Sequence, residues 1–120
     1  MDRETLVNTR TGEVVGAGIE VARSHWQRMR GLLGRDGLPT GGGMRFDGTS
    51  SIHMAFMRFP IDVLYLDRRG RTVKLVHDLK PWRLSAARGA KVTIELPAGT
   101  LRALDIRAGD QIEAQPVATS

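Results

Sequence analysis

Asp62-Val63-Leu64-Tyr65-Leu66-Asp67, followed by Arg68-Arg69-Gly70-Arg71, is the stretch of sequence that decides the fold class. Apolar residues fall on both faces of the first segment, which predicts a strand inside a sheet, covered on both sides. The second segment is typical of a tight turn. Beyond it, Val73, Leu75 and Leu79 share one face of a further strand. The two strands together predict an antiparallel hairpin.

Further short strands are expected on either side of this hairpin. A first hairpin is predicted near the N-terminus, with a strand over 5–9, a turn over 10–13 and a returning strand from Val14 to Val21. Short strands are expected over 44–46 and 52–54. Residues 92–96 alternate strictly, which predicts a half-buried strand. A last strand begins at Ile112.

Two short helices complete the pattern. Ser24 and Gln27 have the spacing of a capping box, so the first helix is expected from Ser24 to about Gly34. The second is expected from Pro97 to Leu104. The sequence therefore predicts an α+β, β-rich fold: a partly closed barrel or a bent, mostly antiparallel sheet with two short helices.

Length and composition limit the classes of protein to consider. A chain of 120 residues is expected to form one domain over 1–120, with 116–120 as a flexible tail. Because it has 0 Cys, disulfides, iron–sulfur clusters and thiol catalysis are excluded. The N-terminus has no signal-peptide pattern, and no apolar run is long enough for a membrane helix. We therefore expect a cytoplasmic monomer with no membrane contact.

The formal net charge of +5 raises the question of nucleic-acid binding. Sequence-independent binding needs a continuous positive stripe. The basic residues instead alternate with acids along much of the chain, as in Arg35-Asp36 and Asp67-Arg68, or Arg107 near Asp110. The sequence thus predicts weak or no nucleic-acid binding, and a nucleic-acid-binding barrel protein stays an alternative.

The densest unusual segment runs from Ser51 to Asp62. In an extended chain His53 and Met57 share a face, and Arg58 and Asp62 flank the bend that Pro60 imposes. Asp62 can pair with an arginine or cap backbone N–H groups, which are structural roles. The other interpretation is a shallow binding site formed by His53, Met57, Arg58 and Asp62. Its second wall would be the 80–90 loop, where Trp82 is expected to expose its ring.

The sequence contains no recognisable catalytic set. The three histidines, at 25, 53 and 77, are too far apart for a local metal pair, so no metal or cofactor is predicted. There is no G-x-S-x-G nucleophile motif. An enzyme would need His53 as a general base near Asp62, with an arginine holding an anionic substrate. This hydrolase-like alternative is testable because the two side chains must point to the same side of the sheet.

Several segments in order resemble the domain of unknown function 192 family, a set of small prokaryotic domains. They are Arg30–Arg35, Gly43–Phe46, Ser51–His53, Met57–Val63, Tyr65–Asp67, Glu95–Thr100 and Gly109-Asp110. The resemblance covers about 22–113 and implies a compact, β-rich domain without an established activity. Relatives often carry Pro-Cys where this chain has Gly48-Thr49, so a thiol-dependent role is not expected. Residues 96–112 are also similar to the unit of swapped-hairpin and cradle-loop barrels.

The favoured hypothesis is therefore a small, non-catalytic binding or accessory module for a small ligand or a protein partner.

Overall fold

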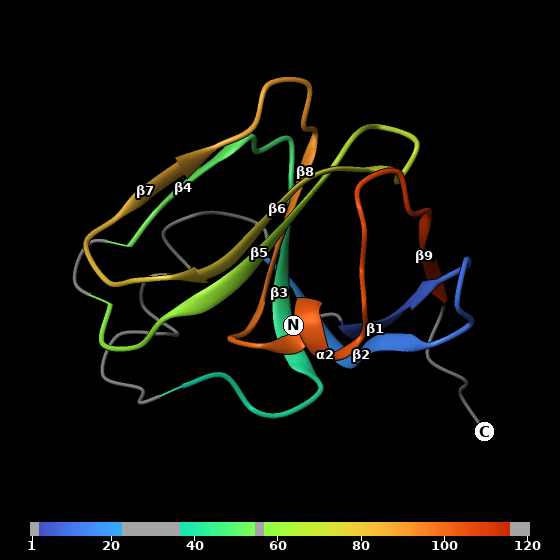
Figure 1. The fold of residues 1–120 in the computed structure, drawn as a ribbon, viewed down its shortest axis with the longest axis horizontal. Helices are drawn as coiled ribbons and strands as arrows, with labels where there is room; N and C mark the ends of the chain where they lie inside the picture. Colours follow the sequence, from blue (N-terminus) through green and yellow to red (C-terminus); the bar gives the residue numbers. More distant parts are fainter. Residues whose placement is uncertain (1–2, 23–36, 55–56, 116–120) are drawn as a thin grey trace.

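A bent sheet of seven strands forms most of the protein (Figure 1). The computed structural model describes residues 3–22, 37–54 and 57–115. The strand order is β6-β5-β8-β3-β2-β1-β9, and β4 and β7 form a separate two-stranded sheet. The strands are β1 (Arg3–Asn8), β2 (Val14–Ala22), β3 (Gly42–Asp47), β4 (Ser51–His53), β5 (Ile61–Leu66), β6 (Thr72–Leu79), β7 (Leu84–Ala86), β8 (Val92–Pro97) and β9 (Ile112–Gln115).

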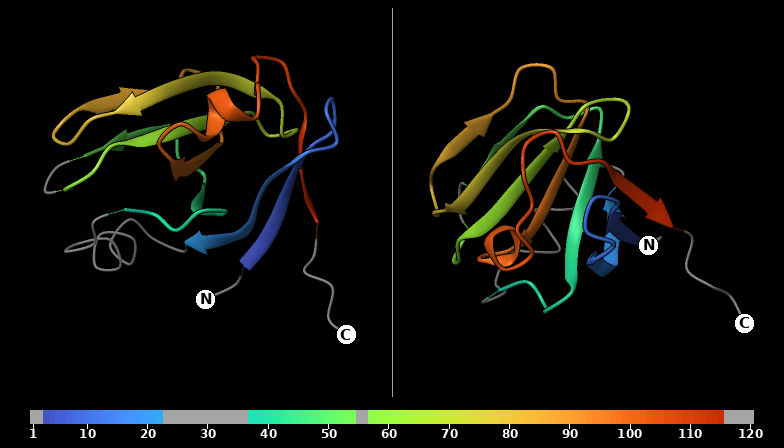
Figure 2. Two further views of the ribbon diagram at one scale, coloured as in Figure 1. Left: turned by 60° about the horizontal axis from the view of Figure 1, so that its bottom comes forward. Right: turned by 45° about the vertical axis from the view of Figure 1, so that its right-hand side comes forward.

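The sheet curves strongly but does not close into a barrel (Figure 2). Its two outermost strands, β6 and β9, are not paired as neighbours in the described sheet; an isolated bridge between Arg71 and Gln111 and a few backbone hydrogen bonds join the residues at their starts. Among the described residues all pairings are antiparallel except that of β2 with β3, which is parallel. The β-rich, bent and mostly antiparallel prediction is confirmed, and the parallel pair was not anticipated.

Strand β5 separates two apolar clusters, as its sequence predicts. Ile61, Val63 and Tyr65 enter one cluster together with residues of β3 and β4, which we call the ribbon-side core. Leu64 and Leu66 enter the other, the helix-side core, together with residues of β1, β2, β8 and β9. Every residue of β5 is buried. Period-two alternation along one strand thus supplies both cores.

Strand β8 is buried on both faces, so the prediction of a half-buried strand is wrong. Thr93 and Glu95 are fully buried although they occupy the polar phase of the pattern. The reason is the position of β8 between β5 and β3, where both of its faces are covered. Alternating polarity indicated a strand but not how far it is buried.

The expectation that Val73, Leu75 and Leu79 share one face of β6 is also wrong, since Leu75 packs against the helix-side core and Leu79 belongs to the ribbon-side core. Thr72 is buried and Val73 is exposed, the reverse of the periodic pattern. The β5–β6 register shifts between the pairs that contain Tyr65 and Leu66, and such an irregularity inverts the faces beyond it.

One short helix, α2 (Thr100–Ala103), lies in the described part of the chain, within the range predicted for the second helix. The helix expected over 24–34 and the tail at 116–120 lie outside the described residues.

At Gly43 three strands approach one another closely. A Cβ at this residue would lie 2.4 Å from the Glu95 carbonyl oxygen of β8 and 3.0 Å from the Ile19 side chain of β2. A backbone atom cannot move aside as a flexible side chain can. Strand β3 can therefore pair with both neighbours only if residue 43 has no side chain.

The Gly43→Ala variant should lower the free energy of unfolding by about 1–3 kcal/mol, because the added methyl group overpacks a rigid junction. Urea unfolding measures this change. Gly37→Ala is the control, since a Cβ there meets no atom within 4 Å. Equal stability of the two variants would contradict the steric argument.

Asp110 fastens the segment after α2 to the first hairpin. Its carboxylate accepts hydrogen bonds from Asn8 Nδ2 at 2.8 Å, Arg10 Nε at 2.7 Å and the Arg107 backbone N–H at 2.8 Å. The Arg10 guanidinium is the main cause that lowers the pKa of Asp110 to about 2. The ionised carboxylate therefore stabilises the native state.

This contribution predicts a defined pH dependence. A carboxyl group whose folded pKa lies below its ordinary value of 3.8 stabilises the protein at neutral pH, and the effect disappears as the pH falls from about 5 to 2. Asp110→Asn should cost about 2 kcal/mol at pH 7 and flatten the acid limb of the stability curve. Denaturant titrations between these pH values test this, with exposed Glu113→Gln as the control. An unchanged acid limb in Asp110→Asn would contradict it.

Candidate functional site

The structure disperses the five predicted site residues. Met57 is buried in the ribbon-side core and Asp62 is fully buried on the other side of β5. His53 on β4, Arg58 and Trp82 are exposed. Because two of the five are enclosed by packing, the shallow site is not assembled as predicted, and only the exposed residues can contact a ligand.

Asp62 performs the backbone-capping role that the sequence suggested. Its Oδ1 accepts from the Asp78 backbone N–H at 2.9 Å. Its Oδ2 accepts from the N–H groups of Gly99 at 3.0 Å and Leu101 at 2.9 Å. One buried carboxylate thus joins the end of β6 to the start of α2, and these bonds compensate its removal from water.

His53 and Asp62 lie on opposite sides of the seven-stranded sheet. Asp62 shares the phase of Leu64 on β5 and contacts the helix-side core. Strand β4 covers the other side, where Ile52 enters the ribbon-side core while His53 is exposed. The geometry required for a joint acid–base role is therefore absent from this pair.

We expect Asp62→Asn to lower the free energy of unfolding by about 2–4 kcal/mol, because an amide cannot accept all three hydrogen bonds and leaves buried N–H groups unpaired. Thermal and urea unfolding provide the measurement. Asp78→Asn is a matched control, since that side chain is exposed and its backbone N–H is retained. Near-wild-type stability of Asp62→Asn would exclude the anchoring role.

The exposed candidates lead to the two-stranded sheet of β4 and β7, which we call the ribbon (Figure 1). His53 pairs with Leu84 and Ser51 pairs with Ala86, so these four side chains share the outer side. Together with Trp82 at the end of the ribbon, they define the ribbon face. Leu84 is 80% exposed and Trp82 is 65% exposed.

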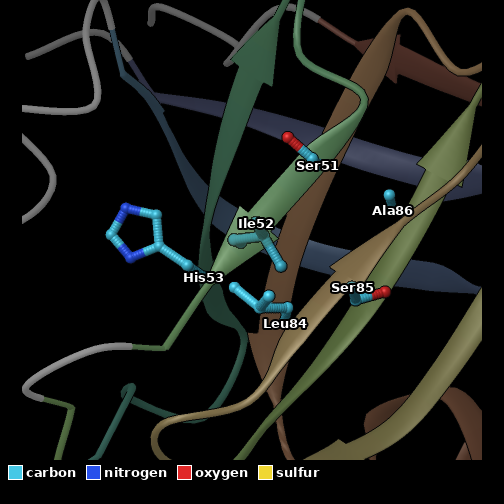
Figure 3. A pocket seen from close by; sticks show the side chains of 6 residues that line it. All are labelled: Ser51, Ile52, His53, Leu84, Ser85 and Ala86. Carbon is cyan, nitrogen blue, oxygen red and sulfur yellow. The ribbon is translucent and has the colours of Figure 1, made fainter.

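A shallow pocket of about 410 Å³ lies on the ribbon (Figure 3). Its lining is Ser51, Ile52, His53, Leu84, Ser85 and Ala86. Figure 3 shows these side chains arising from both strands, with His53 projecting to one side. The lining is mostly apolar and contains one ionisable side chain, His53. Such a surface suits an apolar group better than acid–base chemistry.

The inner side of the ribbon is fixed to the body of the protein. The Tyr65 hydroxyl of β5 donates to Ser85 Oγ at 2.9 Å, and Lys74 Nζ of β6 donates to the Ala86 carbonyl oxygen at 2.8 Å. The side chain of Ile52, in β4, faces inward and is buried. These contacts hold the outer side chains in place from below, so the ribbon face is a supported surface.

The connection into β7 has an unusual backbone. Trp82 has a φ of 68°, which bulky residues rarely adopt, and its N–H donates to the Met54 carbonyl oxygen at 2.8 Å. Such a conformation persists only where neighbouring contacts enforce it, and it is often found at functional sites. Here it places an aromatic residue at the end of the ribbon.

Sequence reasoning missed β7 and Leu84. Residues 80–90 contain one Pro and little periodicity, and a strand of three residues leaves almost no pattern. The available signal was the single apolar residue, Leu84, between Arg83 and Ser85. Without knowledge of β4 as its partner, that residue does not indicate a surface.

A second cavity, of about 280 Å³, lies between the two ends of the bent sheet. Two of its charged residues have partners: Arg45 forms ion pairs with Glu4 and Asp47, and Asp67 accepts from the backbone N–H groups of Arg69 and Arg71. These contacts indicate a structural role for Arg45 and Asp67.

Two general features can be stated for the described ranges. Within 3–22, 37–54 and 57–115, no group of three or more acidic or histidine side chains is placed to hold a metal ion. None of the helices described there is long and apolar enough to cross a membrane.

The sequence matches the model of the domain of unknown function 192 family, described as uncharacterised ACR, over residues 6–114. The chain belongs to this family. The match begins earlier than the 22–113 range that carried the resemblance. A UPF0127 protein of Thermococcus sibiricus is 32% identical over 117 residues, which is 90% of this chain and 73% of that protein.

Two solved structures are similar to this member of the family. A Sinorhizobium meliloti 1021 protein, provisionally described as a transcription regulator, has a TM-score of 0.78 and 26% identity, covering 93% of this chain and 92% of its own. A Novosphingobium aromaticivorans protein of unknown function has a TM-score of 0.76 and 24% identity, covering 92% and 83%. The second similarity concerns the fold alone.

Proposed function

We propose that this member of the domain of unknown function 192 family is a non-catalytic binding module that holds a protein partner on its ribbon face. The observation that carries the proposal is the exposure of Leu84 on a strand whose inner side is fixed to the core. Trp82 at the end of the ribbon adds a second large apolar side chain. Tryptophan is also among the residues most enriched in binding hot spots.

The physical argument is the free energy available from covering these side chains. Burying a leucine yields about 1.5–3 kcal/mol relative to leaving it in water. A single exposed leucine is ordinary. Leu84, however, lies beside Ala86 and the apolar pocket, and tryptophan side chains lose few rotamers on binding. The ribbon face therefore offers more to a partner than scattered surface residues do.

A protein segment fits this surface better than a small molecule. Ligand pockets for small molecules enclose most of the ligand, whereas this pocket lies open on a two-stranded ribbon. The description of the Sinorhizobium relative concerns that protein, and a binding module is compatible with it. A cytoplasmic location, a monomeric state and weak or no nucleic-acid binding stay predictions.

The test uses an uncharged peptide of about 12 residues with alternating Ser, Gln, Leu and Phe, titrated into ¹⁵N-labelled protein. We expect the amide signals of β4 and β7 to shift. Leu84→Ser should weaken binding at least about fivefold, because it removes the central apolar contact. Its stability should change little, since the side chain is already in water.

Val14→Ser is the matched control, because Val14 is an exposed apolar residue of β2 outside the ribbon. It should leave binding unchanged. The proposal is wrong if the shifts lie elsewhere, or if the two variants weaken binding equally. A thermal-shift screen of small metabolites tests the alternative, a small ligand on the ribbon face. An increase in the unfolding midpoint that Leu84→Ser abolishes would assign the face to a small ligand.

A further inference from the structure

The positive charge of the chain is concentrated in the segments that build the ribbon. Residues 48–61 and 79–94 contain no Asp or Glu. Their basic residues are Arg58, Lys80, Arg83, Arg88 and Lys91. The other thirteen Lys and Arg equal the thirteen Asp and Glu in number, so these two stretches carry the formal net charge of +5.

Folding brings the two stretches together, because β4 belongs to the first and β7 to the second. Arg58 follows β4, Arg83 directly precedes β7, and Arg88 lies two residues beyond its end. These residues and Lys80 are exposed. The ribbon is thus an apolar strip with cations near its ends. One exposed acidic residue, Asp78, directly precedes the second stretch.

These cations differ from the paired basic residues of the described structure, as Arg68, Arg69, Arg71 and Arg102 also do. Arg10, Arg45 and Arg107 form ion pairs with acidic side chains. Arg58, Lys80, Arg83 and Arg88 form no ion pair with any residue that the structure describes. Internal pairing therefore does not explain why these four positions are basic.

We infer that the partner segment is acidic, with a bulky apolar side chain seated against Leu84 and carboxylates facing the surrounding cations. This inference rests on the proposed function and names the class of its partner. Opposite charges around an apolar contact accelerate association and exclude partners of the wrong sign. The cations flank the apolar strip instead of filling it, which matches a segment with acids on either side of an apolar residue.

Nucleic acid fits the same surface less well. Its backbone requires closely spaced cations along a track, and its bases require several aromatic side chains for stacking. The centre of the ribbon face is Leu84 and Ala86, and its two rings, those of His53 and Trp82, are fewer than stacking along a strand requires. An apolar centre with a basic border favours a protein segment.

The experiment compares two peptides of about 12 residues that share their Leu and Phe positions and differ only in carrying Glu or Gln between them. Each is titrated into ¹⁵N-labelled full-length protein, with the amide signals of β4 and β7 as the readout. At about 25 mM salt the Glu peptide should bind at least about tenfold tighter, and at about 500 mM most of this advantage should disappear.

Two charge-reversal variants locate the effect. Arg83→Glu/Arg88→Glu should abolish the advantage of the Glu peptide. Arg68→Glu/Arg102→Glu changes the net charge equally at exposed positions outside the ribbon and should preserve most of it. Circular dichroism checks folding, and Arg83→Gln/Arg88→Gln, expected to lose at least half of the advantage, replaces the first variant if it does not fold.

Each other outcome overturns the inference in a distinguishable way. Equal affinity of both peptides for the ribbon would refute the acidic partner and leave the binding module standing. Absence of ribbon shifts with either peptide would refute both proposals. Ribbon shifts with a single-stranded oligonucleotide of about 30 nucleotides, or with anionic lipid vesicles, at lower concentration than with the Glu peptide would assign the face to that partner instead.

Discussion

The carboxylate of Asp62 is the constraint on which much of the architecture depends. It is buried on β5 and accepts three backbone N–H groups from the end of β6 and the start of α2. A buried carboxylate without such bonds would cost several kcal/mol. The burial of Asp62 therefore requires the end of β6 and the start of α2 to be in place. The same geometry removes Asp62 from any surface chemistry and separates it from His53.

Because these contacts occupy the helix side of β5, the candidate functional surface lies over the opposite side of this strand. Ile61, Val63 and Tyr65 project there, and Tyr65 reaches Ser85 in the ribbon. Strand β4 contributes Ile52 to the same core. Because the inner residues of the ribbon are used for packing, alternation leaves Ser51, His53, Leu84 and Ala86 outside. The exposed apolar side chains thus follow from how the core is covered.

The sequence predicted the elements that carry their own pattern. Residues 62–79 indicated a hairpin with a buried first strand, and capping of backbone N–H groups was one of the roles considered for Asp62, which follows the bend at Pro60. Whatever depends on neighbours in space was not predictable: the burial of Glu95 results from β8 lying between two strands. Leu84 looked like an isolated residue because β7 can be recognised as a strand only from its pairing with β4. Of the five predicted site residues, Met57 and Asp62 belong to the interior, and the other three are exposed.

The arrangement of charge depends in the same way on neighbours in space, which the sequence alone does not show. Acids and bases alternate in most segments, and in the structure several of them form pairs, such as Arg107 with Asp105 and Arg10 with Asp110. The two segments without acids are separated by β5 and β6 in sequence, so their common character is not local. Only the pairing of β4 with β7 turns two weakly basic segments into one surface. The grouping of like charges on the folded surface, rather than net charge, is therefore the quantity that points to a partner.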